Sequence, residues 1–192
     1  MYQKGNKELE IISLFRGNYK KRFYLREISK IANMPLKTCQ NTLSKLEESK
    51  ILKSNVEGKN KYFALNLENI KTKLYLQHAE IYQTDKFIEK HKLIKTFLKS
   101  TNTAATIIIF GSFAKSLENK NSDLDMLIVS NKAEALSNHL LPSKLHKIKM
   151  SEKNFLKAIN QQENLIKEIE ENHIILNNHS FYVNIMWNYY GN

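Results

Sequence analysis

The sequence, 192 residues long, has few of the residues that interrupt regular structure: it contains 5 Gly and 2 Pro. Because glycine and proline are the least favourable residues in helix interiors, their scarcity predicts a chain that is mostly regular and largely helical. The sequence also contains a single cysteine, Cys39, which excludes a disulfide framework and a zinc site built from several cysteines. One cysteine suits a reducing compartment.

Long apolar stretches are absent as well. No segment approaches the roughly 18 consecutive apolar residues that indicate a transmembrane helix. The first ten residues are polar and lack the apolar core of a signal peptide. Hydrophobic residues make up 42% and charged residues 26% of the sequence, a globular balance that excludes a disordered or fibrous protein. We therefore expect a cytoplasmic globular protein without a membrane partner.

Negative charge is in short supply. The sequence has 30 Lys and Arg against 19 Asp and Glu, a formal net charge of +11 at pH 7. Such an excess indicates a polyanionic partner, which can be DNA, RNA, a phosphorylated ligand or an acidic protein. A lysine-rich composition shared by a whole proteome gives the same excess. The placement of the charges has to decide between these interpretations.

The N-terminal third is predicted to form helices followed by a hairpin. Apolar residues at helical spacing, with Pro35 favoured at the first position of the last helix, predict the helices. Two extended runs around the polar turn at residues 57–60 predict the hairpin. The helices are expected at residues 7–15, 25–32 and 35–49, and the strands at residues 51–54 and 62–65.

This order of elements over residues 24–65 resembles a winged helix-turn-helix, the motif that sets a recognition helix in the major groove of DNA. Cys39, Leu43 and Leu46 then form the core side of the recognition helix. Its other side carries residue types that bond base edges and phosphates, and the tip of the wing adds lysines. The expected DNA-binding residues are Lys37, Thr38, Gln40, Asn41, Ser44, Lys45, Lys59 and Lys61.

Domains of this kind also serve as dimerisation or protein-interaction modules with a merely solvated polar face. Duplex DNA is the favoured partner here, because Lys20, Lys21, Arg22 and Arg26 add positive charge nearby.

Residues 69–100 are polar and helical in pattern, and we expect a long connecting helix, broken near residues 84–85. Ile70, Leu74, Ile81 and Ile88 form a near-heptad stripe on it. The stripe either packs inside the chain or pairs two chains in a homodimer, and the sequence leaves both open. The expected domains are residues 1–67, 68–100 and 101–192.

The chemistry is concentrated after a β-branched run at residues 106–110, which predicts a buried strand. Gly111 ends this strand and allows the backbone to approach a ligand, and Ser112 offers donors to phosphate. Asp123 and Asp125 are two residues apart at the start of a second apolar strand, so their side chains share one face. Paired carboxylates invite Mg²⁺, which binds one or two of them together with substrate phosphates.

A Gly-Ser turn, a short helix and loop, and Ser-Asp-x-Asp opening an apolar strand resemble the minimal nucleotidyltransferases of the DNA-polymerase-beta-like superfamily. The resemblance extends from about residue 101 to the C-terminus. It implies that a hydroxyl attacks the α-phosphorus of a nucleoside triphosphate and pyrophosphate leaves. It assigns nucleotide binding to Gly111, Ser112, Lys115 and Ser122, and catalysis and metal binding to Asp123 and Asp125.

The sequence departs from the family at one point. The family carries a third acidic residue on a later neighbouring strand, where it completes the metal site and serves as general base. The corresponding strand here, residues 144–150, contains no acid, and Glu152 lies just beyond it. His146 is a candidate base on that strand. The departure leaves a two-metal site in doubt and predicts either a slow enzyme or a relic that only binds nucleotide.

The sequence as a whole predicts an α+β protein: a winged helix-turn-helix, a long connecting helix and a nucleotidyltransferase domain with a small mixed sheet. The order of segments also resembles archaeal proteins that pair these two domains. We expect an Mg²⁺-dependent nucleotidyltransferase that uses a nucleoside triphosphate, ATP above all, and a hydroxyl acceptor on protein, RNA or a small molecule.

Two alternatives stay open at this point. One is a transcription regulator whose second domain only binds nucleotide or holds a dimer. The other is an RNA-modifying enzyme that grips its substrate with the winged helix. Some relatives in the broader family are antitoxins that modify a partner toxin, which makes a protein acceptor such as a toxin a further expectation.

Overall fold

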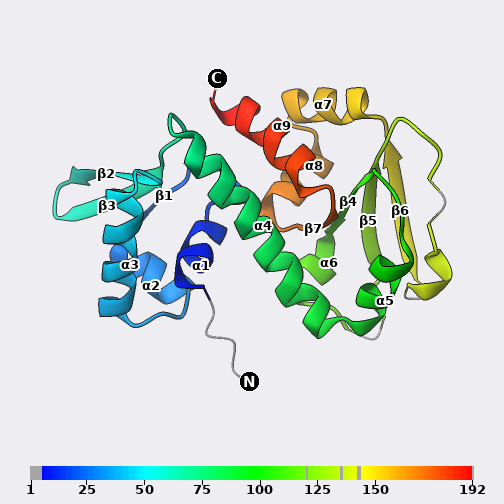
Figure 1. Cartoon of the computed structure of the whole chain (residues 1–192), viewed down its shortest axis with the longest axis horizontal. Coiled ribbons are helices and arrows are strands. Elements are labelled where there is room, and N and C mark those ends of the chain that lie inside the picture. The colour runs from blue at the N-terminus through cyan, green and yellow to red at the C-terminus, as the bar shows by residue number, and fades with distance from the viewer. Residues whose placement is uncertain (1–5, 120, 135, 142–143, 192) are drawn as a thin grey trace. The chain divides into compact units, whose positions relative to one another are not determined.

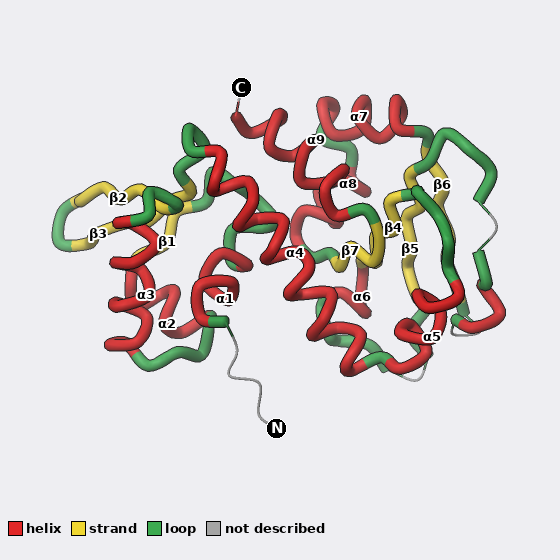
Figure 2. The backbone as a smooth tube through the Cα atoms, in the orientation of Figure 1, coloured by secondary structure: helices red, strands yellow, loops and turns green. Residues whose placement is uncertain are grey.

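A computed structural model gives the fold of residues 6–119, 121–134, 136–141 and 144–191 (Figure 1; Figure 2). The chain divides into two compact units. The N-terminal unit comprises residues 6–79 and 186–191, and the C-terminal unit comprises Glu80–Ile185. The predicted domain boundaries, 1–67, 68–100 and 101–192, include residues 1–5 and 192, which lie outside the described residues, and they stay a prediction. None of the described helices combines the length and apolar composition needed to cross a membrane.

The helices of the N-terminal unit begin close to their predicted positions. The Asn6 side chain accepts hydrogen bonds from Glu8 N and Leu9 N, at 3.1 and 3.2 Å, and so caps the first helix. The sequence predicts Pro35 as the first residue of the third helix, but Pro35 has an extended ψ of 137° and that helix begins at Leu36. The helices are α1 (Lys7–Ser13), α2 (Leu25–Ile31) and α3 (Leu36–Glu48).

An antiparallel sheet in the order β1-β3-β2 completes this unit. Its strands are β1 (Arg22–Tyr24), β2 (Leu52–Glu57) and β3 (Asn60–Leu65). β2 and β3 form the predicted hairpin, and Gly58 takes a left-handed φ of 61° in its turn. β1 is not among the predicted strands, because its 3 residues are too few for a recognisable alternation.

The core of the N-terminal unit fixes which side of α3 faces solvent. Cys39, Leu43 and Leu46 are buried as predicted, with at most 1% of each residue exposed. Phe15 and Phe23 pack edge to face, with their ring centroids 5.1 Å apart.

The connecting segment differs from its prediction in two respects. Ile70, Leu74 and Ile81 of α4 (Ile70–Lys90) are 63%, 51% and 50% exposed, so the interpretation that the stripe packs inside the chain is wrong for these three residues. It is confirmed for Ile88, which is partly buried and packs against the buried cluster of the C-terminal unit. Pairing of two chains through the three exposed residues stays a prediction. The break also lies elsewhere than residues 84–85: α4 runs to Lys90, and α5 (Lys92–Ser100) begins after His91.

Thr84 explains why α4 continues through the predicted break. Its hydroxyl lies 3.0 Å from the Glu80 carbonyl oxygen one turn earlier and 2.6 Å from the Ile175 carbonyl oxygen. Because this polar group is satisfied within the C-terminal unit, it does not interrupt the helix.

The C-terminal unit contains the small mixed sheet that the sequence predicts. Its order is β6-β5-β4-β7, in which β5 and β6 are parallel and the other neighbours antiparallel. The strands are β4 (Thr106–Phe110), β5 (Leu124–Val129), β6 (Leu145–Met150) and β7 (Ile174–Asn177), and the helices that follow β5 are η1 (Asn138–Leu140), α7 (Glu152–Gln161), α8 (Asn164–Glu171) and α9 (His179–Gly191).

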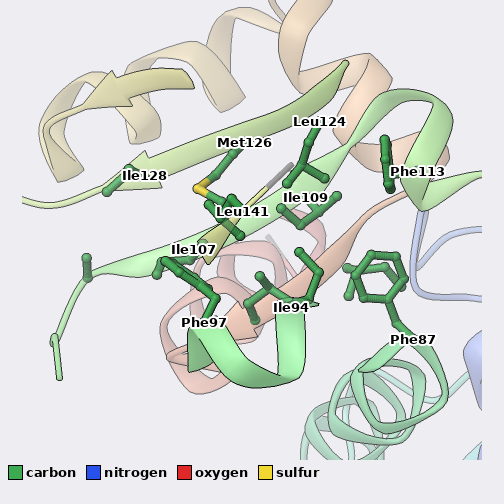
Figure 3. Close-up of a cluster of buried hydrophobic side chains, with 13 residues drawn as sticks. Phe87, Ile94, Phe97, Ile107, Ile109, Phe113, Leu124, Met126, Ile128 and Leu141 are labelled. Atoms are coloured by element: carbon green, nitrogen blue, oxygen red, sulfur yellow. The ribbon is translucent and has the colours of Figure 1, made fainter. Parts of the chain in front are cut away.

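One buried cluster fixes the two central strands against α5. Alternate residues of β4 and β5 point into it, Ile107 and Ile109 from β4 and Leu124 from β5, and Phe97 of α5 packs against them (Figure 3). The intervening Ile108 and Leu127 are buried as well, so both faces of the sheet are covered. This packing supports the place where the end of β4 pairs with the start of β5, Phe110 opposite Asp125.

The cluster around α5 gives a direct test of this packing. Phe97→Ala removes a ring that is 0% exposed and is expected to lower the free energy of unfolding by about 3–5 kcal/mol. Leu93→Ala on the same helix is the control, because Leu93 is 58% exposed and its loss should cost less than about 0.5 kcal/mol. Urea denaturation followed by circular dichroism measures both, and equal losses would contradict the assigned face of α5.

Candidate active site

The Gly-Ser turn lies where β4 ends, and α6 (Gly111–Ala114) begins there without an intervening loop. Gly111 has a φ of 67°, a left-handed conformation that glycine adopts without strain. A Cβ on Gly111 would overlap Asp125 Oδ2 and lie 3.1 Å from Asp125 Cγ. The absence of a side chain at Gly111 thus makes room for the Asp125 carboxylate.

The register of β4 and β5 brings these two residues together. Phe110, the last residue of β4, pairs with Asp125, the second residue of β5. The neighbouring Leu124 is 0% exposed, whereas the Asp125 side chain is 26% exposed, as strand alternation requires. Asp123 directly precedes β5 and is exposed. The predicted carboxylates therefore stand at one end of the sheet, beside the predicted phosphate-binding turn.

His146 is the nearest polar partner of Asp125. β5 and β6 are parallel, and their register sets His146 opposite Asp125. The imidazole Nδ1 lies 3.1 Å from Asp125 Oδ1, to which it donates a hydrogen bond. The acid-free segment forms the strand β6, with the sequence LHKIKM, and histidine lies opposite Asp125.

Two lysines near the predicted site, Lys115 and Lys144, have partners other than the two aspartates. Lys115, at the end of α6, lies 3.7 Å from Glu171 Oε2, measured from its Nζ. Lys144 Nζ donates to the Asn121 carbonyl oxygen at 3.3 Å. Among the described residues neither Asp123 nor Asp125 forms an ion pair with a lysine. Both carboxylates are available to a ligand.

The two serines of the predicted site differ in their surroundings. Ser122 Oγ accepts a hydrogen bond from Asn119 N at 2.9 Å, and Ser122 N donates to the Asn119 carbonyl oxygen at 3.1 Å. These bonds close the turn that delivers the chain to Asp123. Ser112 is half-buried on α6, and its carbonyl oxygen accepts from Leu117 N at 3.0 Å. Ser112 lies with Gly111 at the turn, whereas Ser122 shapes the loop before the carboxylates.

A group of residues that the sequence does not predict packs against α6 through Phe113. The His91 ring lies 4.2 Å from the Phe87 ring and 5.7 Å from the Phe113 ring, and burial lowers the pKa of His91. Lys90 Nζ donates to Glu118 Oε1 at 2.7 Å. Although burial opposes it, this bond leaves the pKa of Glu118 below its ordinary value. No local sequence motif predicts the contact between Lys90 and Glu118, because the two residues are 28 positions apart.

The two carboxylates at this end of the sheet can supply only part of the ligands of a metal ion. In the part of the chain that the structure describes, no three His, Cys, Asp or Glu side chains converge as a full metal site. Mg²⁺ does not need one, since it is held by one or two carboxylates and completes its sphere with water and substrate phosphates. Asp123 is exposed, and Asp125 is partly exposed and lies in the space that the missing Cβ of Gly111 leaves. These two carboxylates fit that requirement.

The predicted DNA-contacting side of α3 faces solvent. Thr38 is half-buried and the other five predicted residues of this helix are exposed. A shallow hollow of about 210 Å³ lies against them and is lined by Lys7, Thr38, Asn41, Thr42 and Lys45. The predicted residues of α3 are Lys37, Thr38, Gln40, Asn41, Ser44 and Lys45.

The two predicted lysines of the hairpin are placed differently. Lys59 lies in the turn and is exposed. Lys61 lies on β3, where its Nζ donates to Glu47 of α3 at 2.7 Å. A larger hollow is lined by Lys59 together with Arg26, whose charge the sequence analysis notes, and with Tyr24 and Tyr62, which the sequence does not single out.

A comparison with protein families identifies the fold around the Gly-Ser turn. A family model described as polymerase beta, nucleotidyltransferase matches residues 92–181. A polymerase beta nucleotidyltransferase domain occupies this stretch. It includes the Gly-Ser turn, both aspartates and every strand of the sheet β6-β5-β4-β7. Neither a search of curated proteins nor a search of solved structures gives a match.

The close approach in the nucleotidyltransferase domain is tested by Gly111→Ala. The new Cβ must displace Asp125, so we expect this variant to lose more stability than the roughly 1 kcal/mol that a left-handed alanine costs. Gly58→Ala is the matched control, because Gly58 has a φ of 61° and open space around it. Hydrogen exchange of the two units in the full chain measures both losses. Equal losses would show that Asp125 does not press against Gly111.

Proposed function

We propose that the nucleotidyltransferase domain binds a nucleoside triphosphate, with ATP as the expected nucleotide, and transfers its nucleotidyl group to a hydroxyl acceptor. The observation that carries this proposal is the Asp125 carboxylate, which lies against the bare backbone of Gly111 at the end of the sheet. This contact supports the proposal, because it joins the turn to which we assign phosphate binding and the carboxylate to which we assign metal binding.

The chain's own residues have separate roles in this proposal. The backbone of Gly111 and Ser112 receives the phosphates, and Lys115 adds positive charge beside them. Asp123 and Asp125 hold Mg²⁺, which neutralises charge on the phosphates when it is bound. Ser122 stabilises the loop before Asp123, because its hydroxyl accepts a hydrogen bond from Asn119 N.

The transfer itself is a substitution at phosphorus. The acceptor oxygen forms a bond to the α-phosphorus, the bond from that phosphorus to the bridging oxygen breaks, and pyrophosphate leaves. The acceptor proton is released to solvent. The protein contributes by positioning the reacting groups and by electrostatic stabilisation of the phosphates.

For the N-terminal unit we propose a winged helix-turn-helix that binds duplex DNA. α3 is its recognition helix, and β2 and β3 form its wing. The support is the exposed polar and basic side of α3, opposite the buried Cys39, Leu43 and Leu46. Lys61 serves to fix the wing to α3 through Glu47, and Lys59 is the wing residue available to phosphate.

A second candidate function has one observation in its favour. β6 offers histidine in place of a carboxylate opposite Asp125. A domain that lacks this acid can bind nucleotide without turning it over, in which case the chain is a DNA-binding transcription regulator. An acceptor on a protein, such as a toxin partner, or on RNA belongs to the first candidate function.

The enzymatic proposal predicts transfer of label from ATP labelled at its α-phosphate. Asp123→Asn combined with Asp125→Asn is expected to abolish both this transfer and Mg²⁺-dependent ATP binding, because the metal loses its carboxylates. Glu163→Gln, at the N-cap of α8, with Glu168→Gln on α8 changes the charge equally and should leave both unchanged. ATP binding with no transfer to protein, RNA or small hydroxyl compounds would select the regulator. Unaltered Mg²⁺-dependent binding by the double aspartate variant would contradict the site.

The DNA-binding proposal predicts that Lys37→Glu with Lys45→Glu weakens duplex binding and makes its salt dependence shallower. The loss of two phosphate contacts should reduce the slope of log K against log salt by about 2. Lys71→Glu with Lys73→Glu on α4 gives the same change in net charge outside α3 and the hairpin. Fluorescence anisotropy with duplex DNA measures both. If the two double variants weaken binding equally, net charge and not α3 accounts for it.

A further inference from the structure

We propose that His146 is a ligand of the cation at Asp125 and gives the site a preference for Mn²⁺ over Mg²⁺ that depends on its imidazole. This inference rests on the proposed function, because it concerns the same metal position. It goes further in naming a nitrogen donor and a metal class.

The fold holds His146 beside Asp125 through backbone pairing. β5 and β6 pair continuously from Leu124 with Leu145 to Val129 with Met150, so their register is set over 6 residue pairs. Successive side chains of a strand point to opposite faces, so His146 and the following Lys147 lie on opposite faces of β6. Lys144, two residues before His146, donates its Nζ to the Asn121 carbonyl oxygen at 3.3 Å and not to Asp125.

The distance between the two side chains suits joint coordination. Nδ1 of His146 and Oδ1 of Asp125 are 3.1 Å apart. Two donors that bind one octahedral ion at about 2.1 Å and at right angles are separated by about 3.0 Å. Such an ion would lie to one side of the line between the two atoms, on which the hydrogen-bonding proton now lies. A neutral imidazole that carries its proton on Nε2 supplies the lone pair.

The chemistry of the pair points away from an all-oxygen site. Mg²⁺ is bound through oxygen, whereas imidazole is a ligand of transition-metal ions. Mn²⁺ is the weakest binder in that series and also takes carboxylate and water, so among these ions it is the one closest to Mg²⁺ in its ligands. His146 and Asp125 form such a mixed pair. Since 59% of the His146 side chain is exposed, an incoming ion reaches it directly, and burial gives the imidazole no structural role in a core.

The test is titration of the full-length protein with MnCl₂ and with MgCl₂ by calorimetry, together with a pulsed electron paramagnetic resonance spectrum of bound Mn²⁺. The spectrum is expected to show coupling to an imidazole nitrogen, and His146→Gln should abolish it. The same change should lower the Mn²⁺ affinity about tenfold and leave the Mg²⁺ affinity nearly unchanged. His146→Asp, which supplies oxygen, should raise the Mg²⁺ affinity and remove the coupling.

The controls separate this inference from the proposed function. His78→Gln removes an exposed imidazole on α4 and should alter neither affinity. Bound Mn²⁺ that shows no nitrogen coupling, and is lost in Asp125→Asn, would overturn the role of His146 and leave the carboxylate site standing. Metal binding that survives in Asp125→Asn would instead contradict the proposed metal position itself.

Discussion

The C-terminal unit is organised around one close approach, that of the Asp125 carboxylate to Gly111. Only a residue without a Cβ leaves room for the carboxylate, and the φ of 67° at Gly111 is itself a glycine conformation. The antiparallel register that pairs Phe110 with Asp125 determines where the contact falls. That register depends in turn on the buried cluster, since a slip by one residue would expose Leu124 and bury Asp125.

Much of this site could be predicted from the sequence because its signals are local. Gly111 and Ser112 follow directly on a β-branched strand, and Asp123 and Asp125 open another, so residue type and spacing already indicate the chemistry. The hairpin and the core side of α3 are predictable for the same reason. Each depends on a pattern contained in a few consecutive residues, and the structure confirms both.

The features that sequence patterns miss depend on pairings between distant segments. The contact between Asp125 and His146 joins residues 21 positions apart and requires the register of two parallel strands. The continuation of α4 past Thr84 depends on the carbonyl of Ile175, 91 positions away. The exposure of Ile81 shows the converse, because an apolar stripe at helical spacing indicates a helix and does not determine which side of it is covered.

The two proposed activities share a ligand group, phosphate, and differ in how its charge is met. On α3 the lysines themselves face solvent, so positive charge can act on a polyanion directly and the contact is sensitive to salt. At the end of the sheet β6-β5-β4-β7 the side chains next to the turn are carboxylates, which repel phosphate unless a cation lies between them. Under the proposed function, a chain with net charge +11 that carries Asp123 and Asp125 next to the Gly-Ser turn would therefore need a cation to join these carboxylates to phosphate. In our proposal the donor opposite Asp125 sets the preferred cation, so a single residue on β6 would select the ion that joins the protein to its nucleotide.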